Sequence, residues 1–73
     1  MSNASALDVF RDNLRTACER KGISQQELAR KSDVHYVTIN RIFRGHITPT
    51  IPVAERLAKA VGFSLEKIFA EGR

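Results

Sequence analysis

The sequence predicts an all-α domain built from five short helices. Apolar residues recur every three or four positions along most of the chain, which is the period of an amphipathic helix, and no stretch alternates as a half-buried strand does. Ser or Thr residues before a segment and glycines after it divide this pattern, as residues at the starts and ends of helices do. With 73 residues, the chain has room for one domain and one compact core.

The first segment predicts a helix over about residues 6–20. Ser5 is placed to cap its start, and Gly22 follows its last turn, where glycine commonly ends a helix. We expect residues 1–5 to be a disordered N-terminal tail and residues 6–71 to form the folded domain. The apolar face of this first helix consists of Phe10, Leu14, Ala17 and Cys18.

The second segment has the clearest start of the five. Ser24 and Glu27 make an S-x-x-E capping box, in which each side chain accepts a hydrogen bond from the backbone N–H of the other residue. This helix ends near Ser32, and Asp33 occupies a tight turn with a left-handed backbone, which Asp tolerates better than most residues. The third helix follows directly, over about residues 35–43.

Two further helices complete the predicted fold. Thr50 is placed to cap the fourth helix, which carries Pro52 in its first turn, where the missing N–H of proline does no harm. Gly62 ends this helix, and Ser64 is placed to cap the fifth. On the fourth helix we expect Val53, Leu57 and Val61 to face inward, and the fifth helix carries Leu65, Ile68 and Phe69.

The third helix has two faces of different character. At about 100° per residue, Ile39, Ile42 and Phe43 gather on one side, which we expect to be buried. The opposite side, within an arc of about 140°, holds a mixed set that we call the outward face: Tyr36, Val37, Asn40, Arg41 and Arg44.

The outward face carries side chains that can contact bases in the major groove of DNA. Arg can donate two hydrogen bonds to guanine, and Asn can pair with the edge of adenine. Val offers an apolar contact to the thymine methyl group, and Tyr can bond a phosphate. The alternative interpretation is an ordinary solvated face, on which two arginines complement the C-terminal end of the helix dipole.

Positive charge is concentrated around this third helix. The formal net charge of the chain is +4, and the isoelectric point is about 9.8. No Asp or Glu occurs from Val34 to Ala54, whereas the same stretch contains two arginines and two histidines. Such a local excess of positive charge favours a polyanionic partner.

The sequence gives no support to several other classes of protein. The single Cys18 excludes an internal disulfide and has no neighbouring metal-ligating residues, so we interpret it as a core residue. No catalytic triad, pocket-forming pair of carboxylates or Gly-rich phosphate loop indicates an enzyme, and no pattern calls for a cofactor or a metal. No membrane span or secretory signal is present, which predicts a cytoplasmic protein.

The stretch "SQQELARKSDVHYVTINRIFR" has the spacing of a helix-turn-helix unit. Its key positions hold Leu28, Ala29, Val34, Ile39 and Ile42, and the small Ala29 lies where the second helix crosses close to the third. Together with "ERLAKAVGFSLEKIF", it resembles the Cro and phage-repressor family, also called Xre-type, of bacterial and phage regulators, from about Leu14 to Phe69. The resemblance implies a lambda-repressor-like fold with the motif over about residues 24–44, in a protein associated with the nucleoid.

The resemblance also implies roles for individual residues. Gln25 opens the second helix, where the family commonly clamps a phosphate with a side chain and a backbone N–H. The residues expected to contact bases are Tyr36, Val37, Asn40 and Arg41. The residues expected to contact DNA phosphates are Ser24, Gln25, His35, Thr38, Arg44, His46 and Thr48.

The chain departs from the family pattern at two places. His35 stands where the family usually has a Ser or Thr cap of the recognition helix. Cys18 and Phe43 stand where members often carry an Arg and a Glu that form a buried or half-buried ion pair. Apolar replacement of such a pair can be neutral or stabilising.

The sequence therefore predicts a sequence-specific transcriptional repressor that binds double-stranded DNA. One recognition helix contacts only a few base pairs, so we expect a homodimer on a palindromic operator, formed either in free solution or only on DNA. The alternative is a helical protein–protein interaction module that keeps the fold without binding DNA. The candidate dimer interface, unless its residues complete the core, consists of Ile47, Phe63, Ile68 and Phe69.

Overall fold

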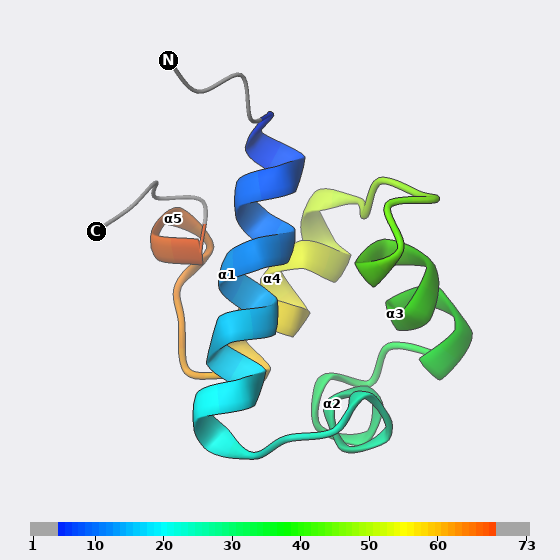
Figure 1. Ribbon diagram of the computed structural model, residues 1–73, viewed down its shortest axis with the longest axis vertical. Helices are drawn as coiled ribbons and strands as arrows, with labels where there is room; N and C mark the ends of the chain where they lie inside the picture. The colour runs from blue at the N-terminus through cyan, green and yellow to red at the C-terminus, as the bar shows by residue number, and fades with distance from the viewer. Residues whose placement is uncertain (1–4, 69–73) are drawn as a thin grey trace.

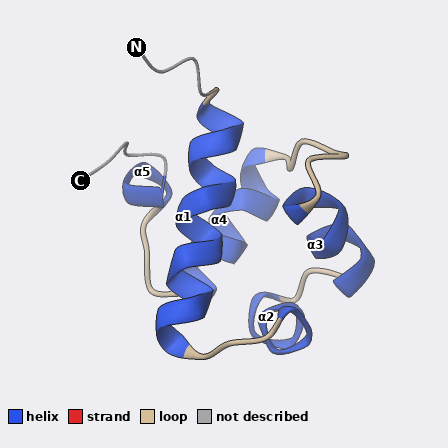
Figure 2. Cartoon of the chain, in the orientation of Figure 1, coloured by secondary structure: helices blue, strands red, loops and turns tan. Residues whose placement is uncertain are grey.

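Five α-helices make up the part of the chain that the structure describes. The structure is a computed structural model, and it describes residues 5–68. In chain order (Figures 1 and 2), the helices are α1 (Ala6–Lys21), α2 (Gln25–Ser32), α3 (Tyr36–Phe43), α4 (Ile51–Ala60) and α5 (Leu65–Ile68). The predicted all-α class and the number of helices are confirmed.

Hydroxyl side chains cap four of the helices at the predicted positions. Each accepts a hydrogen bond from the backbone N–H three residues further along, at 3.1 to 3.4 Å, and so satisfies a donor that the first turn leaves unpaired. The four capping residues are Ser5, Ser24, Thr50 and Ser64. Ser5, the last residue of the predicted tail, belongs to the cap of α1, and the other residues of that tail lie outside the described residues.

A complete capping box occurs at α1 rather than at α2. The Asp8 carboxylate accepts from the Ser5 N–H at 3.4 Å, which completes the reciprocal pair there. At α2 the Ser24 hydroxyl accepts from the Glu27 N–H, but the return bond from Ser24 to the Glu27 carboxylate is absent, so this half of the prediction was wrong. The return bond would fix the long side chain of a Glu, which costs more conformational entropy than fixing the shorter Asp.

The ends of α1 and α2 have the left-handed backbone that the sequence predicts. α1 ends at Lys21, one residue later than predicted, and Gly22 follows it with φ 66°. Asp33 follows α2 with φ 60°, and its N–H donates to the Ala29 carbonyl at 3.0 Å. This turn brings α3 beside α2.

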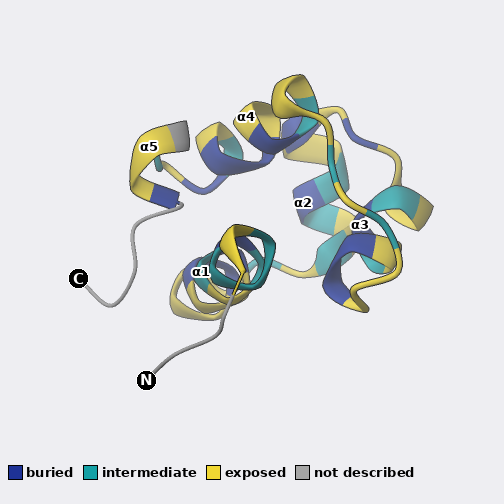
Figure 3. Cartoon of the chain, turned by 90° about the horizontal axis from the view of Figure 1, so that it is seen from above, coloured by how far each residue is buried: buried dark blue, intermediate teal, exposed yellow. Residues whose placement is uncertain are grey.

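All five helices contribute to one core. Figure 3 shows their buried residues turned toward the centre of the molecule. The predicted apolar face of α1 is buried along its whole length. The largest fully buried side chains are Phe10, Leu14, Leu28, Ile39, Ile42, Leu57, Val61 and Ile68.

The core includes a residue that the sequence offered as part of a dimer interface. Ile68 is 0% exposed, and its carbonyl accepts a hydrogen bond of 2.6 Å from the Asn13 side chain of α1. Ile47 and Phe63 are partly buried and pack against the core. These three residues therefore complete the core, because a domain this small uses most of its apolar side chains internally. Phe69 lies outside the described residues.

Candidate nucleic-acid interface

The two helices of the predicted motif lie at one side of the molecule. In Figures 1 and 3, α3 and α5 lie on opposite sides, with α1 and α4 between them. The buried side of α3 contributes Ile39 and Ile42, which are 0% and 1% exposed, and Phe43, which is 9% exposed. These contacts fix which side of α3 faces solvent.

The outward face of α3 is accessible, as the sequence predicts. Tyr36 and Val37 are 41% and 47% exposed, Arg41 and Arg44 are exposed, and Asn40 is half-buried. Large exposed apolar or aromatic side chains are uncommon on a small domain, and here two of them lie in the first turn of one helix beside polar donors. The face combines apolar contact area with hydrogen-bond donors.

A hydrogen bond joins the outward face of α3 to the start of α2. The Asn40 Nδ2 donates to the Gln25 Oε1 at 3.3 Å. Gln25 is the first residue of α2, where backbone N–H groups and the positive end of the helix dipole favour an anion. The bond therefore joins Asn40, which is expected to contact a base, to Gln25, which is expected to contact a phosphate.

Residues 33–35 join two eight-residue helices in a tight turn, and the left-handed Asp33 is the residue that redirects the chain. A family model described as helix-turn-helix matches residues 14–68, which is most of the chain. The chain belongs to this family. The family is the Cro and phage-repressor type, so the resemblance seen in the sequence is confirmed and the protein is a DNA-binding helix-turn-helix regulator. No curated protein and no solved structure matches the chain.

In this helix-turn-helix domain a histidine caps α3. His35 lies directly before α3, and its Nδ1 accepts a hydrogen bond of 3.1 Å from the Val37 N–H. The His35 carbonyl accepts the first intrahelical bond of α3, from the Ile39 N–H at 3.1 Å. His35 therefore does the work that Ser or Thr usually does at this position.

Two arginines of α1, which the sequence did not indicate as part of this surface, lie at the C-terminal end of α3. The Arg15 guanidinium donates to the Phe43 carbonyl at 3.1 Å and lies over the Phe43 ring, 5.5 Å from its centroid. Arg11 lies against Gly45 and forms an ion pair of 2.9 Å with Asp8. Their spacing of four residues, which puts both on one face of α1, was the signal available in the sequence.

The remaining residues expected to contact phosphates lie around these elements. Ser24 is exposed at the start of α2, and Thr38 is half-buried on α3. His46 and Thr48 are exposed in the segment between α3 and α4. The expected contact residues thus come from the start of α2, from α3 and from the segment after it.

Cys18 is a core residue. It is 7% exposed, and burial, followed by the nearby charge of Glu19, raises the pKa of its thiol above the usual value. A buried thiol that stays protonated is a poor nucleophile and a poor metal ligand. Among residues 5–68, no group of three or more His, Cys, Asp or Glu side chains could hold a metal ion, and no helix there is long and apolar enough to cross a membrane.

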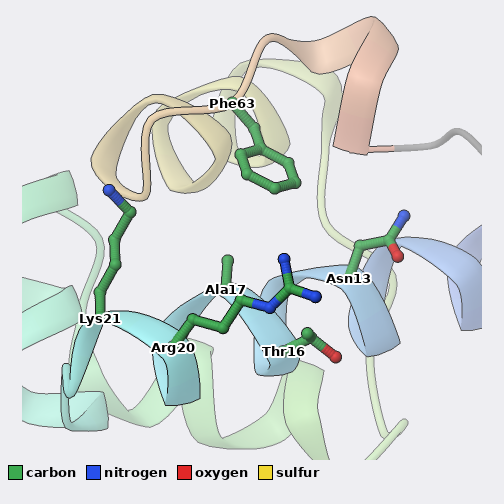
Figure 4. A pocket seen from close by; sticks show the side chains of 6 residues that line it. All are labelled: Asn13, Thr16, Ala17, Arg20, Lys21 and Phe63. Carbon is green, nitrogen blue, oxygen red and sulfur yellow. The ribbon is translucent and has the colours of Figure 1, made fainter. Parts of the chain in front are cut away.

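A hollow of about 310 Å³ lies beside α1, away from the recognition helix. Figure 4 shows the Phe63 ring pointing toward α1, while Arg20 and Lys21 extend from the last turn of α1. Asn13, Thr16 and Ala17 complete the lining, so the lining contains no carboxylate, imidazole or thiol. None of these residues belongs to α2 or α3, and the hollow is therefore separate from the outward face.

Proposed function

We propose that this helix-turn-helix protein is a sequence-specific transcriptional repressor that binds double-stranded DNA as a homodimer, with α3 in the major groove. The observation that carries the proposal is the division of α3 between a buried side and an exposed, chemically mixed outward face. An α-helix fits the major groove of B-DNA, where each base pair presents a distinct pattern of donors and acceptors.

The outward face supplies the chemistry for base recognition. Arg41 can donate to guanine O6 and N7, Asn40 can pair with adenine, and Val37 can contact a thymine methyl group. Tyr36 completes this proposed set of base contacts. The proposed phosphate contacts, which fix the position of the helix on the duplex, are Ser24, Gln25, His35, Thr38, Arg44, His46 and Thr48.

The small size of the domain supports dimer binding, and occupation of the DNA by a dimer supports repression. One recognition helix contacts few base pairs, and two copies related by a two-fold axis double the length of the site and make it palindromic. The half-sites are centred about 34 Å apart, one turn of the double helix. A dimer seated in two consecutive major grooves excludes other proteins from the same stretch, which is a direct route to repression.

Selection of bound duplexes from a random DNA pool tests this function. We expect a palindromic consensus, and a binding constant whose logarithm falls linearly with the logarithm of salt concentration, by about 0.9 per neutralised phosphate. Absence of DNA binding even at low salt would contradict the proposal and favour the protein-interaction alternative, for which the exposed Tyr36, Val37 and Ile51 would be the contact residues.

Two charge-reversal variants make the test specific to α3. Arg41→Glu and Lys67→Glu change the net charge equally, and both residues are exposed, but Lys67 lies on α5 at the opposite side of the molecule. We expect Arg41→Glu to abolish selection of the consensus and Lys67→Glu to retain it. Equal losses in both variants would mean that net charge alone accounts for binding.

A further inference from the structure

The cap of α3 is an imidazole, a group that can gain a proton near neutral pH. Ser, Thr, Asp and Asn caps accept a hydrogen bond throughout this range, whereas an imidazole accepts only through a ring nitrogen that carries no hydrogen. In this protein that nitrogen is the His35 Nδ1, which accepts from the Val37 N–H at 3.1 Å. The neutral ring therefore carries its hydrogen on Nε2.

Protonation of His35 removes the cap in two ways. A hydrogen on Nδ1 would point at the Val37 N–H, so two donors would face one another and the bond would be lost. The positive charge of the imidazolium would also lie at the N-terminal end of α3, which is the positive end of the helix dipole. Both effects disfavour the helical conformation of the first turn, which holds Tyr36 and Val37.

Two oppositely charged residues lie beside His35. A hollow of about 450 Å³ at the α2–α3 turn is lined by Arg30 of α2, by Asp33 and His35 of the turn, and by Tyr36 of α3. Among the described residues no carboxylate forms an ion pair with His35, and the ring is exposed, so solvent screens both neighbours.

We propose that His35 is a positioning residue that makes base recognition sensitive to pH. In the neutral form it holds Tyr36 and Val37 in the first helical turn, where both belong to the outward face. In the protonated form this turn frays and the base contacts weaken, while the added positive charge still favours DNA phosphates. A fall in pH therefore lowers the preference for the selected duplex over other duplexes more than it lowers the affinity for DNA in general. The DNA part of this inference rests on the proposed function.

The cap itself is tested on the full chain without DNA. The backbone 13Cα chemical shifts of Tyr36 and Val37 report helical structure, and we follow them from about pH 8 to about pH 5.5, the range in which imidazoles titrate. We expect both shifts to move toward random-coil values as the His35 ring protonates. In His35→Asn, which keeps an acceptor at the place of Nδ1 and takes up no proton, we expect them to stay. Shifts that are unchanged in the wild type while the His35 ring titrates would overturn the proposal.

The consequence for DNA is tested by the ratio of dissociation constants for a scrambled and a selected duplex at constant salt. We expect this ratio to fall about fivefold from about pH 8 to about pH 5.5, the factor that corresponds to a lost cap of about 1 kcal/mol. His46→Asn removes the only other imidazole and one proposed phosphate contact, so it should weaken binding to both duplexes and show the same fall in their ratio, whereas His35→Asn should show none. A constant ratio in the wild type, or an equal fall in His35→Asn, would overturn this part. If no duplex is preferred at all, the proposed function fails, and the measurement without DNA still decides the role of His35 as a cap.

Discussion

Asp33 is the one described non-glycine residue with a positive φ, and it determines the turn between the two motif helices. We expect Asp33→Val to lower the free energy of unfolding by about 1–2 kcal/mol, because a β-branched residue is strained in the left-handed region. Asp33→Asn should stay within about 0.5 kcal/mol of the wild type, since Asn tolerates the same backbone. Urea denaturation measures both variants, and an equal loss in the two would mean that the Asp33 carboxylate, rather than its backbone, stabilises the turn.

Arg41 and Arg44 lie on the same face of α3 but have different expected roles on DNA. Arg41 lies within the helix, whereas Arg44 is its C-terminal capping residue, from which we expect it to reach the sugar-phosphate backbone. We expect Arg41→Ala to cost about 1–3 kcal/mol on the selected duplex and to relax the preference at one base pair, a G·C pair. Arg44→Ala should weaken binding to all duplexes about equally and make the salt dependence shallower by about one unit.

Titration of both variants against the selected duplex and its single-base substitutions distinguishes these roles. If Arg41→Ala weakens binding to every duplex equally and leaves the base preference intact, Arg41 is a phosphate contact. Tyr36, Val37 and Asn40 would then carry the base recognition.

The sequence predicts which residues of α3 face outward but not what those residues bond. A period of 3.6 residues is enough to separate Ile39 and Ile42 from the outward face, and burial in the structure agrees. The bond between Asn40 and Gln25 joins residues 15 positions apart, and it depends on how α2 crosses α3. The capping bond of His35 depends on one rotamer and one tautomer of a ring, which no pattern of residue types specifies.

Helix starts were the elements that the sequence predicted best, because caps are local interactions. All four hydroxyl caps occur at the predicted residues, and the end of α1 differs by one position. The contact between α1 and the end of α3 was missed, because Arg15 and the Phe43 carbonyl are 28 residues apart. Periodicity shows which face of a helix is buried, but not which helix covers it.

Only one of the two bonds of a capping box is present at α2, so substitution of Ser24 and of Glu27 should lower the stability of the domain by different amounts. Ser24→Ala should destabilise the domain by about 1 kcal/mol, since it removes the only side-chain bond of the cap. Glu27→Ala should cost less, about 0.3–1 kcal/mol, because its carboxylate contributes only through its charge near the N-terminus of α2. Thermal unfolding measures both, with about 4–8 °C expected for each kcal/mol in a domain of this size. Equal losses would indicate that the full capping box forms in solution.

Arg15 joins α1 to the end of α3. Its guanidinium satisfies the Phe43 carbonyl, one of the last carbonyls of α3, and covers the ring of the same residue. We expect Arg15→Ala to lower the free energy of unfolding by about 1 kcal/mol. Arg15→Lys, which keeps the charge but lacks the planar guanidinium, should recover only part of this loss. Urea denaturation would contradict the role if both variants match the wild type.

At the scale of the whole molecule, the core uses nearly all the large apolar side chains of the described residues. The exposed exceptions are Tyr36, Val37 and Ile51, and only Ile51, at 62%, is exposed by more than half. A stable dimer buries about 1,200–2,000 Å² of surface, with an apolar centre. The described side chains of residues 5–64 and 66–68 offer no patch of that kind, because Ile68 and its neighbours complete the core instead.

We therefore expect the free protein to be a monomer at micromolar concentrations and to assemble in pairs on its operator. Sedimentation of the protein alone should give the mass of one chain, and sedimentation with a palindromic duplex should give two chains per duplex. Because direct contact between two small domains requires the native spacing, inserting about five or about ten base pairs between half-sites should weaken occupancy of the second half-site. A stable dimer without DNA, or one chain bound to each palindromic duplex, would contradict this mode of assembly. The spacing series then separates direct contact between the copies from independent binding, since independent binding depends on neither insertion.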